Sequence, residues 1–556
     1  MTSLEYTKFS HDPVNGIPVF ISLEHSNLTT LEVIMKLLGF LTVLFSVWQP
    51  SYGTTAHKDT DMITTTSGRL RGITEGGVSS FKGVRFGLAP TGSLRWRPPV
   101  AFQSSAVQDA TKLGPSCVQQ FPFASANLTQ LLYNTPPPPE DEDCLFLNVW
   151  VPSPITTSEL KPVVIWIYGG GFVFGTGSLR MYDGASMAKN QDIVVVNFNY
   201  RTNVFGFPAS PDLPLTENNI GLLDQELVLN WVQENIIHFG GDPDQVTIMG
   251  HSAGSESVGV AINRNQTGFR AAIMFSGAPL SPADLPPNFM LFNDFASAMN
   301  CTQSPGPDRL ACLRQIPATV IRNFTNGPSS GQFGVVVDNL THFGDTPGRI
   351  LAHKTRRTPL MIGNAQNDSS FLTLGITNLT EVLQSTLPGV PVSADQIRAL
   401  YPGKNDSRVI EAFSTDIGFR CPNSIWGATM VRSGVKNVFR YTYGAVFPDT
   451  QLFPNAGAWH GSELEVVFGT FNRTTSSNDK AVLSRSLQAA IGNFVKNPTS
   501  RSPASNWNEY DPARKTLAEL AFNGNVDAGS FVSPVTSDVE DGACNAFIDA
   551  ILSPGT

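Results

Sequence analysis

The sequence predicts an α/β protein whose large, mostly parallel central sheet is covered by helices on both faces. Four continuous apolar runs support this prediction, at residues 162–167, 192–197, 245–249 and 359–362. Such runs are typical of strands buried on both faces, whereas half-exposed strands alternate apolar and polar residues. A helical pattern at residues 222–237 separates two of the runs. This alternation of strands and helices is the order expected of a parallel sheet.

The composition indicates a folded chain, and its strand and helix patterns continue almost to the end, which favours one large domain over several small ones. The chain has 556 residues and a net charge of −9, with 41% hydrophobic and 15% charged residues. That balance allows a substantial core and excludes a nucleic-acid-binding protein, which needs a basic surface. We find no repeat of 20–50 residues and no long low-complexity linker. We therefore expect residues 54–556 to form a single domain.

The N-terminal region resembles a targeting segment. After Met35 and Lys36 comes an apolar run from Leu37 to Trp48, followed by the small residues Ser51 and Gly53. This order is typical of a secretory signal peptide, and the run is shorter than the ~20 residues of a membrane span. A buried core helix is the alternative interpretation. We therefore predict a signal peptide at residues 35–53, translation from Met35, and a gene-model extension at residues 1–34.

Other features agree with secretion. Six cysteines are an even number, which permits three disulfides in an oxidising compartment. The C-terminus carries no anchor tail or retention signal, so no stable membrane anchor is expected. Asn-x-Ser/Thr triplets supply the candidate glycosylation sites Asn127, Asn265, Asn323, Asn339, Asn378, Asn405 and Asn472.

Ser252 is the candidate nucleophile. Residues 250–254 fit the pattern Gly-x-Ser-x-Gly, the apolar run 245–249 precedes them, and residues 255–262 form a plausible helix. A strand, a tight glycine-flanked turn and a helix together hold a serine exposed at the end of a sheet. A second match at residues 327–331 contains a proline and follows no apolar run. We interpret that second match as a surface loop.

A glycine run supplies candidate oxyanion donors. Gly169, Gly170 and Gly171 directly follow the first apolar run, and glycines allow backbone N–H groups to approach a ligand closely. We assign Gly170 and Gly171 as donors, with the N–H of Ala253 as the third. A phosphate-binding loop is the alternative, but no Lys-Ser/Thr pair follows and the Gly-x-Gly-x-x-Gly spacing is absent.

His460 and Asp368 complete the candidate triad. The other seven histidines precede Ser252, adjoin it, or lie before the fourth apolar run, whereas a base in the order Ser, acid, His must follow that run. Asp368 is the carboxylate in the loop after residues 359–362 and could orient the imidazole through its Nδ1. Asp338 and Asp345 are weaker rivals for the acid.

Together these motifs resemble the type-B carboxylesterase/lipase family, which includes fungal lipases and cholinesterases. The resemblance extends from about Ser67 to Cys544 and implies the α/β-hydrolase fold. The sequence departs from the family pattern at His251, Asp368 and Ser369, where glutamate, glutamate and glycine are usual. The further segments that carry the resemblance are residues 81–86, 94–99, 142–149, 219–225, 239–243 and 460–469.

The resemblance also implies a disulfide pattern and an activity. The implied pairs are Cys117–Cys144, Cys301–Cys312 and Cys421–Cys544, and the first encloses the loop that acts as a lid in family lipases. The implied activity is that of a secreted serine ester hydrolase acting on a small-molecule or lipid ester, with no cofactor or metal. A carboxylesterase is slightly favoured over a lipase, and a cholinesterase is disfavoured because the lid loop lacks tryptophan for a cation–π contact with choline. A non-catalytic adhesion module on the same fold is the remote alternative, and the oligomeric state is not predicted.

Overall fold

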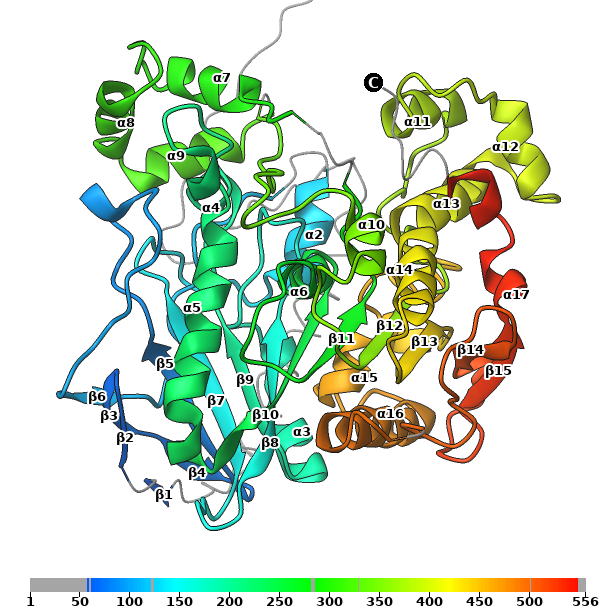
Figure 1. Cartoon of the computed structure of the whole chain (residues 1–556), viewed down its shortest axis with the longest axis horizontal. Helices are drawn as coiled ribbons and strands as arrows, with labels where there is room; N and C mark the ends of the chain where they lie inside the picture. Colours follow the sequence, from blue (N-terminus) through cyan, green and yellow to red (C-terminus); the bar gives the residue numbers. More distant parts are fainter. Residues whose placement is uncertain are drawn as a thin grey trace, which may run out of the picture. The chain divides into compact units, whose positions relative to one another are not determined.

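The structure is a computed structural model that describes residues 58–59, 62–121, 125–281, 286–328, 330–500 and 502–548. The predicted extension, signal peptide and the start of the predicted domain lie outside the described residues. A twelve-stranded sheet forms the centre of the described part (Figure 1). Its strands, in spatial order, are β1 (Lys58–Asp59), β4 (Ile73–Glu75), β5 (Val78–Arg85), β7 (Phe146–Pro152), β9 (Val194–Phe198), β8 (Lys161–Ile167), β10 (Gly241–His251), β11 (Ala271–Phe275), β12 (Leu360–Ala365), β13 (Val438–Tyr443), β14 (Lys515–Leu520) and β15 (Val532–Thr536).

The middle of this sheet is parallel and its edges are antiparallel. Every neighbouring pair from β9 to β14 is parallel. The pairs from β1 to β9 and the pair β14–β15 are antiparallel. The prediction of a large, mostly parallel sheet is therefore confirmed. A small separate sheet contains β2 (Ile63–Thr65), β3 (Gly68–Arg71) and β6 (Val107–Asp109).

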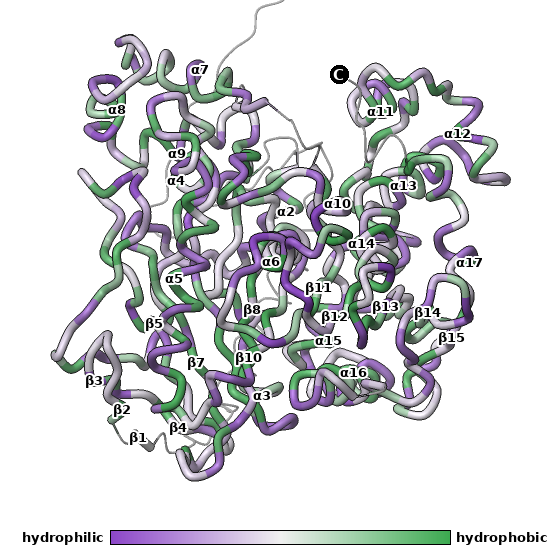
Figure 2. The backbone as a smooth tube through the Cα atoms, in the orientation of Figure 1, coloured by the Kyte–Doolittle hydropathy of each residue, from purple (hydrophilic) through white to green (hydrophobic). Residues whose placement is uncertain are grey.

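Alternate side chains of β8 show that both faces of the sheet are covered. Ile165 and Ile167 lie beside Leu222 of α5 (Ile220–Asn235) and Val260 of α6 (Ala253–Asn263). Trp166 points the other way and packs at ring-centroid distances of 5.3 Å from Tyr182 and 5.0 Å from Phe468. Burial on both faces explains why the strand is continuously apolar. Figure 2 shows the hydrophobic colour concentrated along these central strands.

Helices surround the sheet and form two smaller clusters above it in Figure 1. One cluster packs around α7–α9 and the other around α11–α13. The remaining helices are α2 (Ala126–Tyr133), α3 (Ala185–Gln191), α4 (Asn203–Gly206), α7 (Met290–Ala298), α8 (Pro307–Arg314), α9 (Ala318–Thr325), α10 (Thr346–Leu351), α11 (Leu379–Thr386), α12 (Ala394–Leu400), α13 (Asp406–Thr415), α14 (Cys421–Arg432), α15 (Leu464–Phe468), α16 (Asn478–Lys496), α17 (Ser537–Asp541) and the π-helix η6 (Asp416–Arg420). No helix among the described residues is long and apolar enough to span a membrane.

Three disulfides are present, with sequence separations of 27, 11 and 123 residues. The pairs are those implied by the family resemblance: Cys117–Cys144, Cys301–Cys312 and Cys421–Cys544. The second lies in the cluster around α7–α9, and the third lies in the cluster around α11–α13. The first joins two cysteines separated by 27 positions and closes a loop that contains α2.

Candidate active site

Ser252 lies on a sharp turn between β10 and α6. Its backbone has φ 56° and ψ −127°, a region that non-glycine residues rarely adopt and that is found mainly at functional sites. Two residues before and two residues after Ser252, only glycine fits. A Cβ at Gly250 would meet the carbonyl of Gly254, and a Cβ at Gly254 would meet the carbonyl of Ile167. The turn therefore holds Ser252, which is half-buried, at the carboxyl end of the parallel strands.

The structure brings His460 and Asp368 together. Nδ1 of His460 lies 2.8 Å from Oδ1 of Asp368, and both residues are buried. The other carboxylate oxygen, Oδ2, accepts hydrogen bonds from Oγ of Ser276 and from the backbone N–H of Ala365, both at 2.9 Å. A proton on Nδ1 directed at Asp368 leaves Nε2 as the acceptor that a general base needs.

The rival acids have other roles. Asp338 accepts hydrogen bonds from backbone N–H groups of its own loop, including those of Thr341 and His342. Asp345 caps the N-terminus of α10 by accepting from the N–H of Gly348. The bonds that His460 forms within the described part of the chain involve neither of these carboxylates. Ser329, the central serine of the second Gly-x-Ser-x-Gly match, lies outside the described residues.

The glycine run after β8 approaches the serine turn closely. A Cβ at Gly169 would lie 2.6 Å from the Cβ of Ser252, so only glycine allows this approach. Gly170 and Gly171 have positive φ values of 113° and 59°. In the described part of the chain, no hydrogen bond uses the backbone N–H of Gly170, Gly171 or Ala253. These three N–H groups are therefore available to an incoming oxygen atom.

Ser252, His460 and the glycine run line one cavity of 240 Å³. The rest of its wall is mainly apolar and includes Val173, Phe174, Phe371, Leu372 and Phe419. An apolar wall lowers the local dielectric and strengthens the electrostatic interactions within the cavity. No group of three or more His, Cys, Asp or Glu side chains in the described part is arranged to hold a metal ion.

Two aromatic rings hold the imidazole of His460. The ring of His251 lies 4.3 Å from it and that of Phe419, from η6, lies 4.6 Å from it, measured between ring centroids. His251 is buried, and neither of its ring nitrogens has a hydrogen-bond partner among the described residues. Burial, with a smaller effect of the adjacent His460, lowers the pKa of His251 well below its usual value. His251 is therefore neutral at neutral pH.

The disulfide-closed loop reaches this cavity through Tyr133, the last residue of α2. The Tyr133 hydroxyl donates a hydrogen bond of 2.9 Å to the carbonyl of His460. Its ring also packs against Phe174 and Phe371, with centroids 5.9 Å and 6.4 Å away. The loop therefore forms part of the wall beside the imidazole.

Three residues that the sequence did not predict contact the predicted triad: Ser276, Tyr133 and Phe419. Ser276 directly follows β11, so a search for polar residues at the carboxyl ends of neighbouring parallel strands could have found it. Tyr133 and Phe419 give no comparable signal, because each reaches His460 from a segment whose position depends on packing elsewhere.

Comparisons with known proteins identify the family of the chain. The family model described as "Carboxylesterase family" matches residues 59–533. The chain is similar to acetylcholinesterase of Bungarus fasciatus, with 30% identity over 82% of each chain. It is also 30% identical to cholinesterase of Mus musculus, over 79% of each chain, and to para-nitrobenzyl esterase of Bacillus subtilis, over 82% of this chain and 94% of the relative.

The match covers the central sheet, the serine turn and the loops that carry His460 and Asp368. The family model matches most of the chain, and the similar proteins are all esterases by name. Both findings indicate the same reaction class. The chain therefore belongs to the carboxylesterase family, has the α/β-hydrolase fold and is a carboxylic ester hydrolase.

Proposed function

We propose that this enzyme cleaves esters through a Ser252–His460–Asp368 triad and a covalent acyl-enzyme. The observation that supports this most directly is that Ser252 and His460 line one cavity while His460 is bonded to Asp368. His460 takes the proton of Ser252 as its oxygen attacks the ester carbonyl, and then gives that proton to the leaving alcohol. The N–H groups of Gly170, Gly171 and Ala253 stabilise the oxyanion, and water then releases the acid by the same steps.

The test is Ser252→Ala with a p-nitrophenyl ester as substrate. We expect the variant to lose kcat by at least about 10³-fold, since the nucleophile is removed while the oxyanion donors remain. The matched control is Ser329→Ala, which replaces the central serine of the second Gly-x-Ser-x-Gly sequence and should leave kcat unchanged. Unchanged hydrolysis in Ser252→Ala would reject Ser252 as the nucleophile. An inactive wild-type protein would mean that the ester tested is not a substrate.

We favour a carboxylesterase over an interface-activated lipase because the end of the disulfide-closed loop is fixed. Each of three carboxylates there pairs with an arginine: Glu140 with Arg322, Glu142 with Arg95, and Asp143 with Arg85. A lipase lid has to move away from the site, and these ion pairs oppose such movement. The cavity is also small, and no tryptophan is among the described residues of its wall, which disfavours long acyl chains and choline esters.

The substrate test is a series of p-nitrophenyl esters with increasing acyl length, measured with and without an emulsion. We expect kcat/KM to be highest for short acyl chains and unaffected by the emulsion. A preference for long chains together with activation at the interface would identify a lipase. The para-nitrobenzyl esterase relative makes a p-nitrobenzyl ester a useful further substrate.

We also propose that the protein is secreted, glycosylated and translated from Met35, with a signal peptide at residues 35–53. Three disulfides and the exposure of all seven candidate asparagines support this proposal. Sequencing the N-terminus of secreted protein should find a start near residue 54. A mature protein that begins upstream of Met35 would reject the proposed start.

A further inference from the structure

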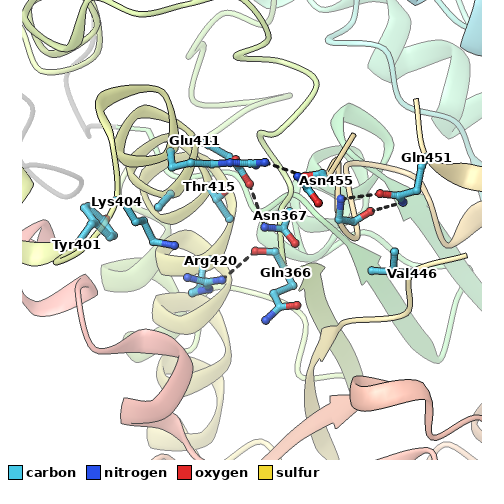
Figure 3. A pocket seen from close by; sticks show the side chains of 13 residues that line it. Gln366, Asn367, Tyr401, Lys404, Glu411, Thr415, Arg420, Val446, Gln451 and Asn455 are labelled. Carbon is cyan, nitrogen blue, oxygen red and sulfur yellow. Dashed lines mark hydrogen bonds and ion pairs between the residues drawn. The ribbon is translucent and has the colours of Figure 1, made fainter. Parts of the chain in front are cut away.

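A second, polar cavity of 690 Å³ is built from the same chain segments as the catalytic cavity (Figure 3). Gln366 and Asn367 line it, immediately before Asp368. Arg420 of η6 also lines it, whereas its neighbour Phe419 contacts His460 in the catalytic cavity. Two of the segments that hold the acid and base are therefore shared between the cavities.

The third shared segment is the loop that leads to His460. Asn455 and Gly457 line the polar cavity, while His460 lines the catalytic one. The N–H of Asn367 donates to the carbonyl of Ala458 at 2.9 Å, which joins the acid loop to the histidine loop. A ligand in the polar cavity would therefore contact the backbone segments that position both members of the Asp368–His460 pair.

Most charged groups in the wall of this cavity already have partners. Glu411 accepts a hydrogen bond from Nδ2 of Asn367 at 2.9 Å and pairs with Arg408. Arg408 also donates to the carbonyl of Asn455 at 3.1 Å. Arg420 pairs with Asp416 and donates to the carbonyl of Gln366. Dashed lines in Figure 3 mark the bond between Glu411 and Asn367 and the bond from Arg420 to Gln366.

Three polar side chains in the wall remain unengaged. Within the described residues, no hydrogen bond or ion pair uses Nζ of Lys404 or the side-chain amides of Gln366 and Asn455. Lys404 therefore provides one positive charge that no wall carboxylate neutralises. The two amides each offer a donor and an acceptor, which suits hydroxyl groups. The cavity volume lies within the usual range of small-molecule sites.

We propose that this cavity is an effector site for a hydroxylated carboxylate of sugar-acid size. The carboxylate binds Lys404, and the hydroxyl groups bind the amides of Gln366 and Asn455. A single free cation fits one carboxylate better than a phosphate, because both wall arginines are already paired with carboxylates. The consequence for catalysis rests on the proposed triad, but binding itself does not.

The binding test is calorimetric titration of the wild-type enzyme with D-galacturonate and with D-galactose, its neutral counterpart. The N-glycans are removed first, because Asn405 adjoins Lys404. We expect saturable binding of galacturonate, weakened about tenfold or more for galactose and for Lys404→Gln. Lys354→Gln, which removes an exposed lysine outside the cavity, is the matched control and should bind like wild type.

Either of two results would overturn the site: no saturable binding of galacturonate, or equal binding by wild type and Lys404→Gln. Binding should persist in Ser252→Ala, because Ser252 lines the other cavity; its loss there would place the ligand in the catalytic cavity and also overturn the site.

The effector role is tested by the hydrolysis of a p-nitrophenyl ester with saturating galacturonate. We expect kcat to change about twofold or more in the wild type and not at all in Lys404→Gln. Binding without any change in kcat would overturn the effector role. Failure of the proposed triad would instead appear as retained hydrolysis in Ser252→Ala, whatever the binding result.

Discussion

Asp368 and Glu463 are both buried carboxyl groups near His460, but their surroundings differ. Asp368 accepts three hydrogen bonds, from His460, Ser276 and Ala365. Glu463 has no hydrogen-bond partner for either oxygen among the described residues. Burial, reinforced by the nearby Asp368, raises the pKa of Glu463 to about 8; the backbone N–H groups of Gly461 and Glu463 itself lie near enough to oppose the shift but do not have the geometry of hydrogen bonds.

The comparison shows that hydrogen-bond partners, rather than burial alone, decide what a carboxyl group can do. Donors directed at both oxygens of Asp368 suit a negative charge that orients an imidazole. Glu463 lacks such donors and is neutral at neutral pH. A neutral Glu463 also adds no second negative charge beside Asp368, where like charges would repel.

The largest effect is expected for Asp368→Asn. The amide would favour the wrong imidazole tautomer, and we expect kcat to fall by about 10⁴-fold, as when the equivalent change is made in other serine hydrolases with this triad. Glu463→Gln is the matched amide substitution and should keep kcat within a few-fold below pH 8. Steady-state kinetics with a p-nitrophenyl ester measures both. Equal losses in the two variants would remove the functional distinction between the carboxyl groups.

The next effect is on stability and concerns Glu463. Because its folded-state pKa lies near 8 and its ordinary value is 4.5, the folded protein retains a proton that the unfolded chain has lost between those pH values. The free energy of unfolding therefore falls as pH rises from 4.5 to about 8, by about 5 kcal/mol at most from this group.

Glu463→Gln tests this effect, because glutamine cannot lose the proton. Chemical denaturation across the pH range should give a flatter profile for the variant than for the wild type. Parallel profiles would show that Glu463 has its ordinary pKa in the folded protein, and that its protonation does not differ from that of Asp368 as proposed.

Ser276→Ala sharpens the comparison by removing one partner of Asp368. Hydrogen bonds to charged groups contribute about 1.5–3 kcal/mol, so we expect kcat/KM to fall about tenfold or more. Ser484→Ala is the control: its hydroxyl is also buried and donates to a backbone carbonyl, that of Val466. It should leave kcat/KM unchanged. If the two variants behave alike, the bond from Ser276 does not support the acid.

Of these two carboxyl groups, the sequence could predict the position of Asp368 but not the burial of Glu463. The apolar run 359–362 predicts a buried strand, and Asp368 follows from its place after that strand. Ser252 follows in the same way from its strand, turn and helix. The burial of Glu463 could not be predicted, because it depends on the packing of α15 and of residues distant in sequence. The polar cavity could not be predicted either, because its wall comes from three segments that are separate in the sequence.

The smallest effect is expected for His251→Gln. Like Glu463, His251 is buried without hydrogen-bond partners among the described residues, and burial lowers its pKa well below the usual value. His251 therefore stays neutral from its ordinary pKa upward, and its titration contributes no step to the pH dependence of kcat/KM in that range. The glutamine side chain of the variant is neutral as well. We expect kcat/KM to decrease a few-fold, because the ring contact with His460 is lost, and the shape of its pH profile to stay unchanged. A change in that shape in the variant would show that His251 titrates during catalysis.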